Sequence, residues 1–130
     1  MRYLIDTHVA LLVLKGEPIS EKARAILDDT AAEVFVSIAS AWEVAIKLST
    51  GKLKYTGGVK TFLDRVKLNE FKMLGVEESH IELVEELEYH HRDPFDRLLI
   101  ATAIAEDMTF LSADENVPKY DVKYLWNKNI

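Results

Sequence analysis

The sequence predicts an α/β sandwich with a mostly parallel sheet, formed by a single domain over residues 1–130. Short runs of β-branched and aromatic residues alternate with longer stretches whose apolar residues recur at helical spacing, the pattern of strands joined by helical crossovers. Hydrophobic residues make up 48% of the chain and charged residues 29%, ordinary values for a folded domain with its own core. The sequence contains no repeat, linker or low-complexity segment.

In the first half of the chain, turn and cap residues separate the predicted elements. Gly16 and Pro18 end the first helix. Ser20 can cap the second helix, and Gly51 closes the third. The strands are expected at residues 2–6 and 34–36, and the helices at residues 7–14, 21–27, 38–49 and 59–66.

The second half continues this alternation with an acidic helix near its start. In that helix Ile81, Val84 and Leu87 share one face, which is expected to point inward. The other expected elements are a strand at residues 71–74, a helix over 94–106, and strands at 109–111 and 122–125.

Four acidic residues occupy places where a hydrophobic strand gives way to a helix or turn. They are Asp6, Glu43, Asp96 and Asp114. In an open α/β sheet the carboxyl ends of the strands line one crevice, so these side chains can converge there. Carboxylates at close range repel unless a cation neutralises them, and hard cations such as Mg²⁺ take oxygen ligands. The pattern indicates a metal-dependent site for phosphate chemistry.

Each of these acids also has a purely structural interpretation. Asp6 can cap the helix that follows it, and Asp114 can be a turn residue after a strand. Glu43 lies three residues after Ser40, the spacing of a capping box. If Ser37 is the cap instead, Glu43 lies further inside the helix and is free to point into the crevice.

The segment before the last helix offers the same choice for two carboxylates. Asp93 suits the N-cap position, with Pro94 as the first helical residue and Asp96 two residues further on. Asp96 then lies near the positive end of the helix dipole, where a carboxylate is favoured. A cap role for Asp93 therefore leaves Asp96 as the candidate for chemistry.

Composition and motif content exclude several other kinds of site. Cysteine is absent, which removes disulfides, thiolate metal sites and a cysteine nucleophile. The sequence has no P-loop, dinucleotide fingerprint or hydrolase elbow, and no histidine pair at the spacing of a helical zinc motif. It has neither a signal peptide nor an 18-residue apolar run, so a cytoplasmic protein without a membrane partner is expected.

Charge is distributed unevenly along the chain, although the net charge is −6. Residues 47–72 contain seven basic and two acidic residues, whereas residues 77–96 contain eight acidic residues and one arginine. Such a chain can hold an anionic polymer on one side and cations on the other. The alternative interpretation is that these are two solvated helix faces.

Four segments resemble PIN-domain ribonucleases, and among these the VapC-type toxins of toxin–antitoxin pairs. They are YLIDTHVALL, SIASAWEVAIKLSTGKL, HHRDPFDRLLIATAIAED and TFLSAD, which run through nearly the whole chain in the family's order. The resemblance implies a PIN-like three-layer sandwich in which a central, mostly parallel sheet of about five strands lies between helices. It also implies a Mg²⁺- or Mn²⁺-dependent endoribonuclease that forms a homodimer and is held inactive by a cognate antitoxin.

The resemblance also implies roles for particular positions. The catalytic, metal-binding acids would be Asp6, Glu43, Asp96 and Asp114, with Glu43 either a ligand or the base for the attacking water. Asp93, Thr7 and Ser112 would support them. The expected contacts to the RNA backbone are Lys47, Lys52, Lys54 and Arg97.

Two other functions remain as alternatives. A phosphatase of another α/β family can begin with a strand that ends in aspartate, but it needs a second aspartate two residues later, where this chain has His8. A catalytically silent PIN-fold binding module would pair with an antitoxin or with itself. A metal-dependent nuclease assay distinguishes the enzyme from the binding module.

Overall fold

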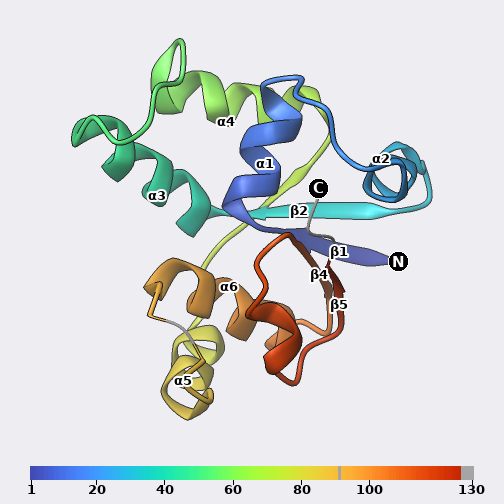
Figure 1. Ribbon diagram of the computed structural model, residues 1–130, viewed down its shortest axis with the longest axis vertical. Helices are drawn as coiled ribbons and strands as arrows, with labels where there is room; N and C mark the ends of the chain where they lie inside the picture. Colours follow the sequence, from blue (N-terminus) through green and yellow to red (C-terminus); the bar gives the residue numbers. More distant parts are fainter. Residues whose placement is uncertain (91, 127–130) are drawn as a thin grey trace.

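A five-stranded parallel sheet forms the centre of the protein in the computed structural model, which describes residues 1–90 and 92–126 (Figure 1). The strand order is β3-β2-β1-β4-β5, and each neighbouring pair is parallel. The strands are β1 (Arg2–Ile5), β2 (Glu33–Ser37), β3 (Lys72–Leu74), β4 (Thr109–Ser112) and β5 (Tyr124–Trp126). The predicted three-layer α/β sandwich with a parallel sheet is confirmed.

Six α-helices and one 3₁₀ turn occur in the described residues. They are α1 (Thr7–Leu14), α2 (Glu21–Asp28), α3 (Ile38–Ser49), α4 (Gly58–Leu68), α5 (Glu78–Glu86), α6 (Pro94–Ala105) and the turn η1 (Val117–Lys119). The predicted helices and strands are all present, with boundaries shifted by no more than two residues. Within the described ranges, none of the helices is both long and apolar enough to cross a membrane.

Side-chain caps fix where several of the helices begin. The hydroxyl of Ser20 accepts a hydrogen bond from the Ala23 N–H at the start of α2, as predicted. At the start of α3, the Ser37 hydroxyl accepts from the Ala39 N–H at 3.0 Å. Ser37 is therefore the cap, and Glu43 lies inside the helix rather than in a capping box.

The two faces of the sheet bury two separate hydrophobic cores. Successive residues of a strand point to opposite faces, so Leu4 packs under α6 whereas Ile5 packs with α1, α3 and α4. Phe62 and Phe110 are the largest fully buried side chains on the two sides. Figure 1 shows α5 and α6 on one side of the sheet, with α1, α3 and α4 on the other.

Helix α5 differs from the prediction in the face that it buries. Ile81, expected to point inward, is 55% exposed, and His80 is fully buried instead. The Glu77 N–H donates to Nδ1 of His80 at 3.0 Å, which completes a capping box at the start of the helix. Apolar spacing alone could not show that this cap turns the helix and leaves Ile81 at the surface.

The connections on either side of β1 create a switch in winding direction. From β1 the chain winds outward to β2 and β3, whereas β4 and β5 lie on the other side of β1. In sheets of this kind, ligands bind at the carboxyl ends of the strands flanking such a switch point. The ends of β1 and β4 are therefore the place at which the topology predicts a site.

Candidate metal centre

A pocket of about 450 Å³ lies at the carboxyl ends of β1 and β4. The four acids singled out from the sequence all line it, although they come from four separate parts of the chain. The lining residues are Asp6, Thr7, His8, Leu11, Glu43, Lys47, Asp93, Asp96, Ala113 and Asp114. Five carboxylates thus share one small space with one lysine.

Asp6 is both a helix cap and a buried wall of this pocket. Its Oδ1 accepts a hydrogen bond from the Val9 N–H at 2.7 Å, and its Oδ2 accepts from the Ser112 hydroxyl at 2.5 Å. Burial raises the pKa of the Asp6 carboxyl, while these two hydrogen bonds act in the opposite direction. The cap and pocket interpretations hold together because the two carboxylate oxygens have different partners.

The end of β4 places its two residues in a continuous chain of hydrogen bonds. The Ser112 hydroxyl donates to Asp6 and accepts from the Asp114 N–H at 3.0 Å. Oδ1 of Asp114 accepts from the Asn116 N–H at 2.9 Å, as in an Asx turn. Asp114 therefore fulfils the predicted turn role and also lines the pocket.

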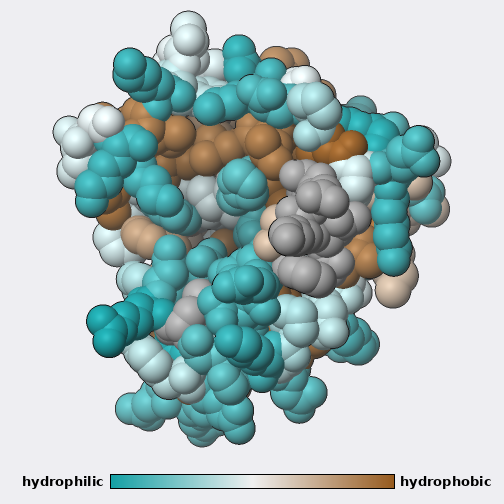
Figure 2. Space-filling view, in the orientation of Figure 1, coloured by the Kyte–Doolittle hydropathy of each residue, from teal (hydrophilic) through white to brown (hydrophobic). Residues whose placement is uncertain are grey.

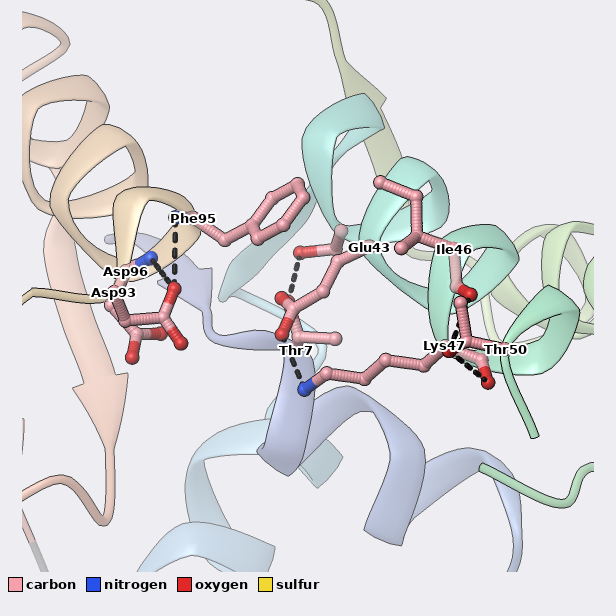
Figure 3. Close-up of polar contacts among 9 residues, drawn as sticks. Thr7, Glu43, Ile46, Lys47, Thr50, Asp93, Phe95 and Asp96 are labelled. Carbon is pink, nitrogen blue, oxygen red and sulfur yellow. Dashed lines mark hydrogen bonds and ion pairs between the residues drawn. The ribbon is translucent and has the colours of Figure 1, made fainter. Parts of the chain in front are cut away.

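The start of α6 separates its two carboxylates into different positions. Asp93 is the N-cap, as predicted, and its Oδ1 accepts from the N–H groups of Phe95 and Asp96 at 2.9 and 3.2 Å (Figure 3). Asp96 is partly buried one turn into the pocket wall. Burial, with the nearby charges of Asp93, Asp6 and two further carboxylates, raises the pKa of Asp96 to about 8.

Glu43 projects into the pocket from the second turn of α3 and is 4% exposed. Its Oε2 accepts a hydrogen bond from Nζ of Lys47 at 2.7 Å, and its Oε1 is buried without a hydrogen-bond partner among the described residues. Beside it, the Thr7 hydroxyl donates to the Ser40 hydroxyl at 2.9 Å, which joins α1 to α3 (Figure 3).

The chemistry of these donors fits a hard divalent cation. They are carboxylate oxygens, one of them an orphaned buried atom, and the pKa of Asp96 is raised because like charges surround it. Among residues 1–90 and 92–126, however, no three acidic or histidine side chains already form a ligand group. Asp6 is held by Ser112, and Glu43 is held by Lys47. Binding a cation at this site thus requires side-chain movement.

The expected RNA-binding residues occupy three different environments. Lys47 lines the pocket, and Lys52 lines an adjoining groove. Lys54 is exposed in the segment that follows α3. The placement of Arg97 does not fit an RNA contact, because it is buried and 8% exposed.

The guanidinium of Arg97 instead fastens the end of α5. It donates to the carbonyl oxygens of Glu88, Leu87 and Val84 at 2.8, 3.2 and 3.3 Å. The expectation of an RNA contact came from its position next to Asp96 in the sequence. Adjacent helical residues point about 100° apart, so a neighbour of a pocket residue need not face the pocket.

Two features of the site were not anticipated from the sequence. One is the Lys47–Glu43 ion pair, for which the i,i+4 spacing on one helix is a usable signal. The other is the buried Ser40, whose bond to Thr7 joins residues 33 positions apart and has no local signature. The pocket also includes His8 and Leu11, which follow Thr7 along α1.

The fold resembles several solved structures. VapBC2 from Rickettsia felis, bound to a DNA fragment from its promoter, has 17% identity and a TM-score of 0.75, covering 98% of this chain and 100% of that one. FitAcB from Neisseria gonorrhoeae has 21% identity and a TM-score of 0.65, covering 96% of both chains. VapBC-1 from nontypeable Haemophilus influenzae has 15% identity and a TM-score of 0.65, covering 97% and 98%.

At these identities the likeness to solved structures shows the fold. Curated protein sequences give no significant match. The model of the PIN domain family, in contrast, matches residues 3–123, which include all four converging acids and every strand up to the start of β5. The chain belongs to the PIN domain family.

Proposed function

We propose that the protein is a metal-dependent endoribonuclease and the toxin of a toxin–antitoxin pair. PIN domains are in general nucleases, and the family model covers most of this chain. The observation that supports the proposal most directly is the pocket itself, in which Asp6, Glu43, Asp96 and Asp114 meet at the ends of β1 and β4. Such a concentration of carboxylates is stable only when protons or cations compensate the charge.

The pocket residues divide into those that would hold a cation and those that orient them. Mg²⁺ or Mn²⁺, when bound, lowers the pKa of a water molecule and stabilises the charge that develops on the phosphoryl oxygens. Asp6, Asp96 and Asp114 would hold the ion. Ser112 keeps Asp6 in place by its hydrogen bond. Oε1 of Glu43 has no partner among the described residues and would accept the proton of the attacking water or serve as a further ligand.

A groove of about 370 Å³ adjoins the pocket and suits the backbone of RNA. It shares Glu43, Lys47 and Asp93 with the pocket, and Lys52 and Arg92 line its further part. Cationic side chains along a groove neutralise phosphates without reading sequence. We infer that the strand to be cut leaves the pocket along this groove, with Lys54 contacting it beyond.

The proposed protein partner is an antitoxin. One similar solved structure is named as a toxin–antitoxin complex from Klebsiella pneumoniae, with a TM-score of 0.63. Figure 2 shows apolar side chains gathered over the region of α1, α3 and α4, whereas the surface over α5 and α6 is mainly hydrophilic. An amphipathic antitoxin segment would cover the apolar surface and reach the acidic pocket. Expression of the protein alone, in the cytoplasm where this pairing would operate, should then inhibit growth.

A homodimer is proposed on a different surface. Trp42 on α3 is 62% exposed and packs edge-on against Phe95, with ring centroids 5.2 Å apart. These two side chains and Ile81, Val84, Pro94 and Leu98 line an apolar hollow of about 260 Å³. An exposed apolar surface of this kind is typical of protein interfaces. Sedimentation of Trp42→Glu as a monomer and of the wild type as a dimer would support this interface.

The experiment that tests the enzymatic proposal is cleavage of an end-labelled RNA by the purified protein in Mn²⁺ and in EDTA. We expect internal cuts in Mn²⁺, none in EDTA, and a loss of at least about 100-fold in Glu43→Gln, since general bases contribute 10²–10⁴-fold. Lys60→Met, on the exposed face of α4, is the control and should cleave normally. A silent binding module would cut nothing, and a phosphatase would release terminal phosphate without internal cuts.

A further inference from the structure

Lys47 occupies an unusual position between the acidic pocket and the basic groove. It lines both, and among the described residues that line the pocket it is the one lysine or arginine beside five carboxylates. Its side chain starts on the exposed side of α3, where it is 44% exposed, and extends inward until Nζ lies 2.7 Å from Oε2 of Glu43. Figure 3 shows the Lys47 side chain running beside α3 towards this carboxylate.

The carboxylate that Lys47 contacts is almost inaccessible to solvent. Glu43 is 4% exposed, and its other oxygen has no hydrogen-bond partner among the described residues. A buried carboxylate with half of its acceptors unused is costly, and the lysine ammonium supplies its one ionic contact within the described pocket. Lys47 therefore compensates a charge that, in the proposed function, a divalent cation would compensate.

We infer that Lys47 is a built-in counter-ion that competes with the divalent cation for Glu43, so that metal loading opens this ion pair and releases the ammonium towards the groove. The inference rests on the proposed function. It explains why the pocket is rich in carboxylates and yet has no ready-made group of three ligands among the described residues. In this account Lys47 is a positioning residue in the metal-free protein and a phosphate contact in the loaded one.

The groove provides a place for the released side chain. Lys52 and Arg92 line it together with Lys47, so a displaced ammonium joins two cations rather than entering open solvent. A phosphate group of the substrate would then be the anion that satisfies all three. Substitution of Lys47 should consequently have opposite effects on the two ligands, strengthening metal binding and weakening RNA binding.

The test measures Mn²⁺ binding calorimetrically in the absence of RNA. Lys47→Met keeps the length of the side chain without its charge, and we expect a Kd about tenfold lower than that of the wild type, or about 1.4 kcal/mol. Lys60→Met is the matched control because Lys60 pairs with Asp64 at the same i,i+4 spacing on α4, outside the pocket. It should leave the Kd within about twofold, since exposed charges beyond a Debye length are screened.

A double-mutant cycle separates direct competition from a general effect of charge. In the Glu43→Gln background the ion pair no longer exists, so Lys47→Met should alter the Mn²⁺ Kd by much less than tenfold. An equal gain in both backgrounds would overturn the inference, as would an unchanged or higher Kd in Lys47→Met, or an absence of Mn²⁺ binding in all forms.

The melting temperature provides a second readout in case the variant is destabilised. Without metal, Lys47→Met should melt below the wild type, because Glu43 loses its counter-ion; saturating Mn²⁺ should remove most of this difference. A deficit of the same size with and without Mn²⁺ would contradict the inference. Normal Mn²⁺-dependent RNA cleavage combined with an unchanged Kd would reject the competition and leave the proposed nuclease function intact.

Discussion

At the scale of single residues, the site is built from side chains that have structural and chemical positions at the same time. Asp6 caps α1 through one oxygen and faces Ser112 through the other. Asp114 closes a turn and also lines the pocket. A carboxylate has two oxygens with several acceptor sites, so a cap role does not exclude metal binding. Asp93 differs, because one of its oxygens accepts from two helical N–H groups.

The first prediction concerns the pH dependence of stability. The pKa of Asp96 is about 8 in the folded protein and about 3.8 in the unfolded chain, so between these values the folded state binds the extra proton. Stability without metal should therefore fall as pH rises from about 4 to 8, and Asp96→Asn should flatten this slope. At pH 8 the variant should be more stable than the wild type by at least about 2 kcal/mol, since one unit of pKa is worth about 1.4 kcal/mol.

Urea denaturation at several pH values in EDTA measures this effect. Asp107→Asn is the control, because Asp107 is exposed and Lys123 lowers its pKa by a direct hydrogen bond. That variant should retain the slope of the wild type from pH 5 upwards. An Asp96→Asn protein with the same slope as the wild type would mean that Asp96 is ionised in the folded state.

The second prediction distinguishes Asp93 from Asp96. Asp93→Ser preserves a side-chain oxygen at the N-cap, so it should fold normally and retain much of the nuclease activity. Asp93→Ala removes the cap and should lose about 1 kcal/mol of stability. Asp96→Asn should abolish cleavage while remaining folded. If Asp93→Ser abolished cleavage and Asp96→Asn did not, the cap and the ligand would be exchanged.

At the scale of the elements, helix α6 joins the site to the rest of the protein through Arg97. This side chain leaves α6 on the side away from the pocket and holds three carbonyl groups at the end of α5. Its planar head also stacks over the ring of Tyr89, with Cζ 4.6 Å from the centroid. The start of α6 carries Asp93 and Asp96, so the α5 contact fixes the helix that presents them.

The third prediction is that Arg97 acts on stability rather than on RNA. Arg97→Met should lower the free energy of unfolding by roughly 2–4 kcal/mol, because buried carbonyls lose their donors. RNA affinity, measured on the protein that remains folded, should keep its dependence on salt concentration. Lys52→Met is the comparison, with normal stability and a salt dependence that is weaker by about one phosphate contact. A reduced salt dependence in Arg97→Met would restore the original expectation of an RNA contact.

The sequence predicted the elements well because their signals are local. Ser20, Gly51 and Asp93 lie at the boundaries they were expected to mark. The choice between Ser37 and Ser40 as the cap of α3 was undecided, since both spacings are acceptable, and the end of β2 determines it. Tertiary contacts likewise decide that Ile81 is exposed and Arg97 is buried. Facing direction depends on neighbours that a single helix does not encode.

At the scale of the whole molecule, the position of the pocket follows from the topology. The winding reverses about β1, and Asp6 and Asp114 lie at the ends of the two strands beside that reversal. The convergence of four distant acids is therefore predictable from a strand–helix pattern once the strand order is known. The apolar hollow around Trp42 is not, because its residues come from α3, α5 and α6 without a common motif.

The fourth prediction is that divalent cations stabilise the entire fold. A ligand bound by the folded state at a hundredfold excess over Kd adds about 2.7 kcal/mol. For a chain of this length that corresponds to a rise in melting temperature of roughly 5–10 °C. Differential scanning fluorimetry in millimolar Mn²⁺ should show the rise, and Asp6→Asn should reduce it. Equal melting temperatures with Mn²⁺ and with EDTA would count against a metal site in the folded protein.

The central claim, that carboxylates from separate strand ends bind a divalent cation, is tested most directly by anomalous diffraction from crystals soaked in Mn²⁺. The account predicts an anomalous peak in the pocket, within about 2.5 Å of carboxylate oxygens from Asp6, Asp96 or Asp114. It also predicts that Nζ of Lys47 has left Oε2 of Glu43. Crystals of Asp6→Asn should lack the peak. A fully soaked wild-type crystal without a peak in this pocket, or with one elsewhere, would contradict the account.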